Sequence, residues 1–216
     1  MSYTLILGNK NLSSWSLRAY LAMRATGAPF TEVVIPLHRP DSHERIVKHS
    51  PSGKVPALVI EENGQHYTVW DSLAICETLA ERFPGAHLWP QDPARRAVAR
   101  SFAAEMHSGF MNLRDQLSMD FARKQPMPPL RPETEAEIAH ILAAWGDVLA
   151  RYGGPFLFGD YSIADMMYAP VVSRFHTYGV SLPPAVAAYG VRVLALATMQ
   201  TWMHAAKAEV ITEGDH

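Results

Sequence analysis

The chain has 216 residues, of which 48% are hydrophobic and 19% are charged, so it can bury the core of an ordinary globular protein. Its formal net charge of −2 offers no field that would attract a nucleic-acid backbone or an anionic membrane surface. No apolar run approaches the roughly 20 residues of a membrane span, and the first residues lack the pattern of a secretory signal. We therefore expect a cytoplasmic protein that binds small molecules and has no nucleic-acid or membrane partner.

The single cysteine, Cys76, excludes an internal disulfide, a cysteine-rich zinc site and a C-x-x-C redox pair. The ten histidines are scattered and lack a metal-binding spacing such as H-E-x-x-H. We therefore expect no metal site. Any thiol chemistry requires a thiol from outside the chain.

The first third of the chain alternates strand-like and helical patterns. Strands are predicted at 3–7, 32–37, 55–61 and 66–70, and helices at 14–26, 44–48 and 71–83. The βαβα order at the start predicts parallel pairing of the first two strands. Asn63-Gly64 is a strong hairpin signal, because both residues tolerate a positive φ, and it predicts antiparallel pairing of the last two strands.

The rest of the chain is predicted to be helical. Residues 84–93 contain three prolines and no periodicity, so they are predicted to link a first domain, 1–83, to an all-helical domain, 94–216. Asp92-Pro93 is predicted to start one long amphipathic helix that reaches Leu117. Later helices are predicted at about 138–152, from the Ser162-x-x-Asp165 cap through a kink at Pro170, and at about 191–207.

Three short segments stand at the starts of predicted elements. They are residues 11–18 (NLSSWSLR), residues 52–58 (SGKVPAL) and the pair Asp71-Ser72. With the βαβαββα order and the helix start at Ser162, they resemble the cytosolic glutathione transferase family, whose thioredoxin-like domain precedes a helical bundle. The sequence is most similar to the serine-type classes, particularly zeta. Trp15 stands where zeta proteins have a cysteine.

Ser13 and Ser14 precede the first predicted helix. Glutathione reacts as its thiolate, and an unperturbed thiol has a pKa of about 8.5. A helix N-terminus and a hydroxyl donor both favour the anion. The resemblance assigns this catalytic role to Ser13, with Ser14 as the alternative and as the expected helix cap, although serines at such junctions often serve only as caps.

The resemblance also implies a binding site for glutathione. Val55, beside a cis Pro56, would offer its backbone to the cysteinyl unit, although a proline is also tolerated at the start of an edge strand. Asp71 would accept from the α-ammonium group of the γ-glutamyl end, and Ser72 would donate to its carboxylate. The same pair could simply cap a helix. Lys54 can reach a ligand carboxylate or remain in solvent.

The family places the electrophile pocket between the two domains. Trp15 and Arg18 are candidates from the first helix, and Arg18 could face an anionic substrate or the thiolate. His107, Met111 and Arg114 would share approximately one face of the long helix, where such residues are often ordinary core.

These residues predict a glutathione S-transferase in which the thiolate of glutathione, the co-substrate, attacks a small-molecule electrophile. The resemblance implies a homodimer and a role in detoxification. One alternative is a zeta-like cis-trans isomerase of a maleyl acid, and another is a non-catalytic carrier of glutathione or hydrophobic ligands. Peroxidase activity stays open, whereas a thiol reductase would need a cysteine near residue 13.

Overall fold

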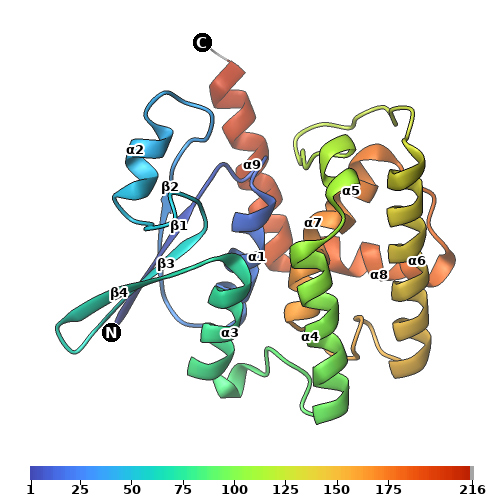
Figure 1. Ribbon diagram of the computed structural model, residues 1–216, viewed down its shortest axis with the longest axis horizontal. Coiled ribbons are helices and arrows are strands. Elements are labelled where there is room, and N and C mark those ends of the chain that lie inside the picture. Colours follow the sequence, from blue (N-terminus) through green and yellow to red (C-terminus); the bar gives the residue numbers. More distant parts are fainter. Residues whose placement is uncertain (215–216) are drawn as a thin grey trace.

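The computed structural model describes residues 1–214 and contains two halves that lie side by side (Figure 1). The first half is a four-stranded sheet with three helices. Its elements are β1 (Ser2–Leu7), α1 (Ser14–Ala25), β2 (Thr31–Val34), α2 (Ser42–Val47), β3 (Ala57–Glu62), β4 (Gln65–Trp70) and α3 (Ser72–Arg82). The βαβαββα order predicted from the sequence is confirmed.

The strands follow the order β2-β1-β3-β4. β1 is parallel to β2 and antiparallel to β3, and β3 forms an antiparallel hairpin with β4. Asn63 and Gly64 take φ values of 54° and 76° in the hairpin turn, which is the conformation for which these residue types are suited. Both predicted pairings are therefore confirmed.

The second half is helical. It contains α4 (Pro93–Ser108), α5 (Met111–Gln116), α6 (Pro132–Tyr152), α7 (Ile163–Tyr178), α8 (Pro184–Ala195) and α9 (Ala197–Gly214), and the 3-10 turn Pro84–Ala86 lies in the segment before it. Its core surrounds Trp145 of α6, whose ring contacts those of Tyr168, Phe175 and Tyr189. The predicted capping box at Ser162 is present, and α7 continues through Pro170.

Helix α1 is buried where the two halves meet. It packs against α3 of the first half and against α7 and α9 of the second half. Leu17, Tyr20 and Leu21 are at most 1% exposed, which explains why the apolar positions of this short helix cover more than one face. The start of α1 is thereby held at the junction of the halves.

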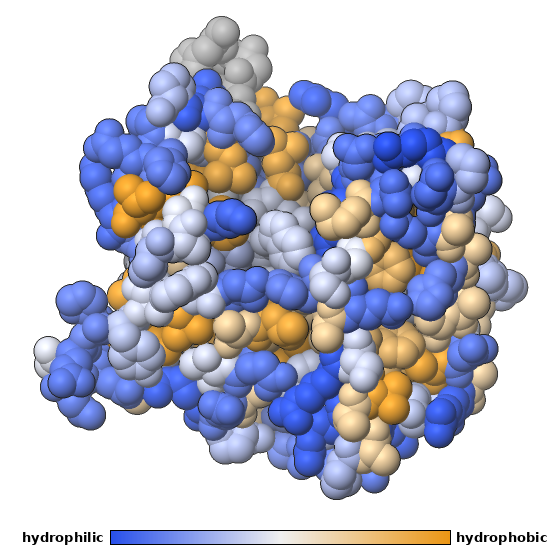
Figure 2. Space-filling model, in the orientation of Figure 1, coloured by the Kyte–Doolittle hydropathy of each residue, from blue (hydrophilic) through white to orange (hydrophobic). Residues whose placement is uncertain are grey.

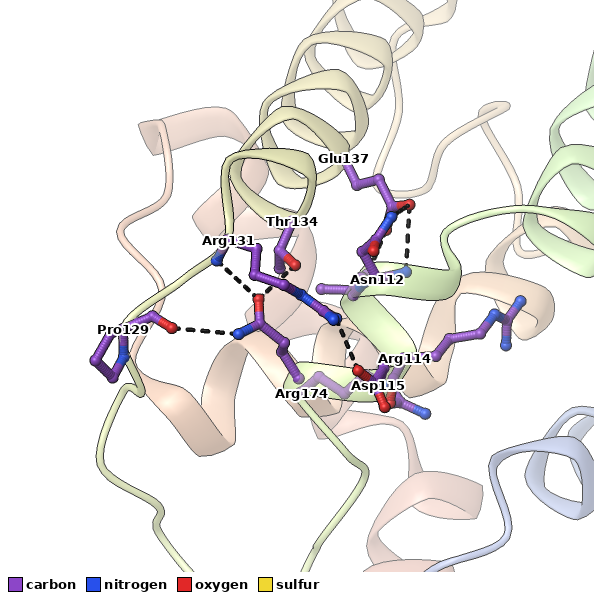
Figure 3. Close-up of polar contacts among 10 residues, drawn as sticks. Asn112, Arg114, Asp115, Pro129, Arg131, Thr134, Glu137 and Arg174 are labelled. Carbon is purple, nitrogen blue, oxygen red and sulfur yellow. Dashed lines mark hydrogen bonds and ion pairs between the residues drawn. The ribbon is translucent and has the colours of Figure 1, made fainter.

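The predicted continuous helix over 93–117 is wrong. After α4, Gly109 is extended, with φ −109° and ψ −168°, and Phe110 is left-handed, with φ 59°. The chain restarts as α5 because the Glu137 carboxylate of α6 accepts hydrogen bonds from the amides of Asn112 and Leu113, at 3.3 and 2.7 Å (Figure 3). A side chain far along the sequence therefore supplies the cap that local periodicity could not reveal.

The single helix predicted at about 191–207 is also wrong. Leu196, with φ −56° and ψ 134°, separates α8 from α9. The break directs α9 back onto the first half, where the fully buried Trp202 packs against Tyr20 with a ring-centroid distance of 4.8 Å. No helix within the described residues is both long and apolar enough to span a membrane.

Candidate active site

A cleft with a volume of about 390 Å³ lies where the starts of α1, β3 and α3 meet the end of α4. Its lining residues are Trp15, Ser52, Lys54, Val55, Pro56, Trp70, Asp71, Ser72 and His107. Figure 2 shows the surface hollowed between the two halves. The cleft thus gathers residues from all three sequence segments that carried the family resemblance.

Asp71 and Ser72 start α3 at this cleft. Asp71 Oδ1 caps the helix by accepting from the amides of Leu73 and Ala74, at 2.9 and 3.4 Å. Its Oδ2 lies 3.1 Å from Nε2 of His107. The Ser72 hydroxyl is buried and has no hydrogen-bond partner among the described residues. Because a buried polar group without a partner is costly, this hydroxyl is a candidate contact for a polar ligand.

The turn before β3 forms another wall. The Val55–Pro56 peptide is cis, as the resemblance implied. Gly53 has a φ of 66°, and the Ser52 hydroxyl accepts from the Lys54 amide at 3.2 Å. All three predicted residues of this segment, Lys54 to Pro56, line the cleft.

Ser52 and Trp70 also line the cleft, although they were not predicted as site residues. Ser52 opens the SGKVPAL segment, and Trp70 directly precedes Asp71. Their positions next to predicted binding residues were the signal that could have identified them.

Ser13, and not Ser14, caps α1. The backbone of Ser13 is non-helical, with φ −85° and ψ 88°, and its hydroxyl accepts from the Ser16 amide at 3.3 Å. The same hydroxyl donates to Ser16 Oγ at 2.7 Å, which in turn accepts from the Gly8 amide at 2.9 Å. The expectation that Ser14 is the cap is therefore wrong, because only Ser13 has the geometry to reach the third amide of the helix.

The Ser14 hydroxyl has no hydrogen-bond partner within residues 1–214, whereas the Ser14 amide donates to the Leu12 carbonyl at 3.1 Å. Both serines are 7% exposed. They do not themselves line the cleft, but the next residue, Trp15, does. The two hydroxyls therefore belong to the residues that precede the wall residue Trp15 in the chain, one committed to the helix cap and one free.

Two guanidinium groups and a histidine ring pack around Trp15. The guanidinium carbons of Arg18 and Arg114 lie 4.4 and 4.6 Å from its ring centroid, and the His107 ring meets its edge at 5.3 Å. Such contacts hold an aromatic ring in one orientation. Trp15 is therefore a fixed wall between the two halves.

Arg18 is fully buried and does not line the cleft. Its Nε donates to the Met167 carbonyl of α7 at 2.8 Å, and its Nη1 has no hydrogen-bond partner among the described residues. Burial lowers the pKa of Arg18 well below its usual value, and the positive charges of Arg114 and Arg174 lower it further. Arg18 can act on a ligand in the cleft only through its charge.

Met111 and Arg114, the two substrate candidates that follow the helix break, do not line the cleft. Arg114 donates to the Gly109 carbonyl at 3.0 Å and to the Met106 carbonyl, so it closes the end of α4. Met111 is 65% exposed and lies outside the cleft lining. The expected shared face of His107, Met111 and Arg114 does not exist, because α4 ends before Met111. Of the five substrate candidates, Trp15 and His107 line the cleft.

Neither metal nor cysteine chemistry is indicated by the residues that line the cleft. Within the described part of the chain, no three His, Cys, Asp or Glu side chains are grouped so that they could hold a metal ion. Cys76 is fully buried in α3, and burial raises the pKa of its thiol to about 12. Protonated and enclosed, this thiol is poorly suited to act as a nucleophile.

Two family models match the chain. The glutathione S-transferase N-terminal domain matches residues 12–82, and the glutathione S-transferase C-terminal domain matches residues 128–209. Rat maleylacetoacetate isomerase is 30% identical over 79% of this chain and 77% of its own length. A probable maleylacetoacetate isomerase of Caenorhabditis elegans is 27% identical over 79% of this chain and 78% of its own length.

Solved structures of glutathione transferases are also similar to this chain. A glutathione transferase homologue from Burkholderia with bound glutathione has a TM-score of 0.70 and 25% identity, covering 96% of this chain and 99% of its own. The Omega 2S glutathione transferase from Trametes versicolor, in complex with 2,4-dihydroxybenzophenone, has a TM-score of 0.73 and 22% identity, covering 100% of this chain and 99% of its own. The predicted α/β plus all-α fold, with a thioredoxin-like domain followed by a helical one, is confirmed.

Proposed function

Because the chain belongs to the glutathione S-transferase family, close to its zeta class, and is a glutathione-dependent enzyme, we propose that its cleft activates glutathione for attack on a small electrophile. One observation carries this proposal. The unpartnered Ser72 hydroxyl, the Asp71 carboxylate and the cis Val55–Pro56 turn line one cleft, although they come from separate parts of the sequence.

Glutathione is oriented by its two ends in this proposal. The Asp71 carboxylate accepts from the α-ammonium group, and the Ser72 hydroxyl donates to the α-carboxylate at the N-terminus of α3. The Val55 backbone pairs with the cysteinyl unit, and Lys54 neutralises the carboxylate at the other end. The thiol is then directed toward Trp15 and the start of α1.

The thiolate is stabilised by the start of α1. A hydrogen bond from a hydroxyl to sulfur is at full strength only for the charged form, and the helix N-terminus adds its partial positive charge. The resemblance favours Ser13, whose proton would turn from Ser16 Oγ to the sulfur. Ser14 is the alternative, and its hydroxyl has no competing partner among the described residues. The charge of buried Arg18 behind Trp15 favours the anion further.

The reaction follows from this arrangement. The thiolate donates an electron pair to an electrophilic carbon and forms a carbon–sulfur bond. With an aryl halide, the halide leaves with the electrons of the bond that breaks. Trp15 and His107 border the space where the electrophile would sit. The protein supplies position and charge, while glutathione brings the nucleophile.

A second candidate is a cis-trans isomerase of a maleyl acid. Two relatives bear the name maleylacetoacetate isomerase, and two guanidinium groups, those of Arg18 and Arg114, lie against Trp15 and provide positive charge for a dicarboxylate. In this reaction the thiolate adds to one carbon of the double bond, the resulting single bond rotates, and expulsion of the thiolate restores the double bond. Glutathione is not consumed.

Further proposals concern organisation. We take residues 1–83 and 94–216 as two domains joined by 84–93, and the active form as a cytoplasmic homodimer that acts in detoxification.

Binding and turnover distinguish these functions. Calorimetry should detect glutathione and S-hexylglutathione, and the enzyme should then convert an aryl halide, a maleyl acid or both. Loss of free glutathione marks transfer, whereas geometric isomerisation without such loss marks the isomerase. Binding without turnover of either substrate would favour a carrier, and binding of neither ligand would contradict the proposed site.

A further inference from the structure

The loop between β1 and α1, residues 8–13, is attached to the C-terminal helix. The two carboxylate oxygens of Glu209 on α9 accept from consecutive backbone amides, that of Lys10 at 2.9 Å and that of Asn11 at 3.1 Å. Trp202 Nε1, also on α9, donates to the Lys10 carbonyl at 2.8 Å. Three successive backbone groups of the loop are thus held by one helix from the other half of the molecule.

The attachment is anchored on both sides. Trp202 is fully buried, and the Lys10 ammonium lies 5.4 Å from the ring centroid of Trp202 and 5.5 Å from that of Tyr20. The same ammonium pairs with Glu32 of β2 at 2.5 Å, and the Lys10 side chain is 14% exposed. Because these groups are largely withdrawn from solvent, their hydrogen bonds are worth more than those of an exposed contact.

The loop transmits this attachment to the start of α1. The amides of Leu12 and Ser13 both donate to the Asn9 carbonyl, at 3.3 and 2.8 Å. On the other side, Asn11 Oδ1 accepts from the amides of Phe121 and Ala122, at 2.8 and 3.0 Å. The backbone that places Ser13 is therefore fixed by α9 on one side and by the segment after α5 on the other.

We infer that Glu209 is a positioning residue for the glutathione thiolate. It holds the amides of Lys10 and Asn11, and through them it sets where the hydroxyls of Ser13 and Ser14 lie. This inference rests on the proposed function of those serines. The negative charge of the carboxylate cannot favour the thiolate, because a negative group near the sulfur would raise the pKa of the thiol. Its contribution is the geometry of the loop.

Two variants separate geometry from charge. Glu209→Gln keeps one oxygen acceptor but turns an amide group toward the second donor, and Glu209→Ala removes both acceptors. If Glu209 acts through geometry, kcat/KM should fall in the order wild type, Glu209→Gln, Glu209→Ala, with a loss of roughly tenfold or more for Ala, since small misplacements near a reacting group are costly. If only charge mattered, both variants would be equal and more active. Lys207→Ala, an exposed change on the same helix, is the matched control.

Three readouts are needed on the full chain. Hydrogen exchange should be faster at the amides of Lys10 and Asn11 in Glu209→Ala, while the melting temperature reports the fold as a whole. Ultraviolet absorbance of the bound thiolate against pH should show a higher thiol pKa in both Glu209 variants and no change in Lys207→Ala. A purely structural role would change the melting temperature and leave this titration unchanged.

Three results would overturn the inference. The first is unchanged exchange at both amides in Glu209→Ala, and the second is faster exchange with a wild-type thiolate titration and wild-type kcat/KM. The third is a wild-type protein that binds glutathione without ionising its thiol. This result would contradict the proposed function itself, and the inference would fail with it because Glu209 would have no thiolate to position. Because this last result appears in the wild type, the two kinds of failure are distinguishable.

Discussion

His107 Nε2 lies 3.1 Å from Asp71 Oδ2, so the end of α4 is joined to the start of α3 at the cleft. The other oxygen of Asp71 caps α3. One carboxylate therefore orders the first turn of a helix and also contacts the opposite half of the molecule. His107 holds this carboxylate in the orientation in which the proposed glutathione site uses it.

Removing this contact should weaken glutathione binding. His107→Phe keeps a ring against Trp15 but loses the polar contact of the imidazole with the Asp71 carboxylate. Since a polar contact of this kind contributes about 1 kcal/mol, the KM for glutathione should rise roughly fivefold while kcat changes less. Steady-state kinetics at varied glutathione check this. His140→Phe, which removes a histidine contact with Glu105 at 2.9 Å, is the control and should leave the KM unchanged; an equal rise in both variants would contradict the role of His107.

The two roles of Asp71 can be separated by substitution. Asp71→Asn keeps an oxygen that can cap α3 but removes the negative charge, so glutathione affinity should fall at least tenfold at nearly unchanged stability. Asp71→Ala should lose the same affinity and also about 1 kcal/mol of unfolding free energy. Calorimetric titration and urea unfolding measure the two quantities. Wild-type affinity in Asp71→Asn would show that the charge does not bind the ligand.

The two serines should respond differently. Ser13→Ala removes the α1 cap and the bond to Ser16, at a cost of about 0.5–2 kcal/mol of unfolding free energy, whereas Ser14→Ala should cost little. The serine that contacts the thiolate should also lose roughly 10- to 100-fold in kcat/KM when replaced. Thermal unfolding and kinetics of both variants therefore separate capping from catalysis. If neither replacement lowered kcat/KM, a hydroxyl would not be the thiolate donor.

The break between α4 and α5 should depend on Gly109. A Cβ atom at this position would lie 2.9 Å from the Glu105 carbonyl oxygen, so Gly109→Ala should destabilise the protein by about 1–3 kcal/mol. The matched control is Gly146→Ala in the middle of α6, where a Cβ atom would have no neighbour within 4 Å. That change should stabilise the protein by about 0.4–1 kcal/mol. Urea unfolding of both variants tests the pair, and a harmless Gly109→Ala would mean that the helix can run on.

Cys76 should not react with thiol reagents in the native protein. Burial raises its pKa to about 12, so at pH 8 the thiol is protonated as well as enclosed. An aromatic disulfide reagent should label one thiol per chain only after unfolding. The unfolded pKa is about 8.5, so the contribution of Cys76 to stability is complete below that pH and declines as the pH rises toward 12. Rapid labelling of native protein at pH 8 would contradict this burial.

The sequence alone determined the first half of the fold and most of the cleft. Strand alternation, the Asn63-Gly64 turn and helix caps such as Asp71 are local signals, because they depend on the conformations of neighbouring residues. The segments around Val55 and Asp71 were assigned from the family resemblance, and in the proposed site each would bind glutathione through groups set by its own turn or helix start.

Only the tertiary structure decided how the distant parts meet. The periodicity of residues 93–117 continues across Gly109, and the helix break depends on Glu137, a residue of another helix. Arg18 was a candidate for contact with an anionic substrate or the thiolate, but it is buried against α7. Glu209 binds the loop before Ser13 although the two are separated by almost the whole length of the sequence. Hydrogen bonds between residues far apart in sequence leave no periodic trace, so they become visible only when the chain has folded.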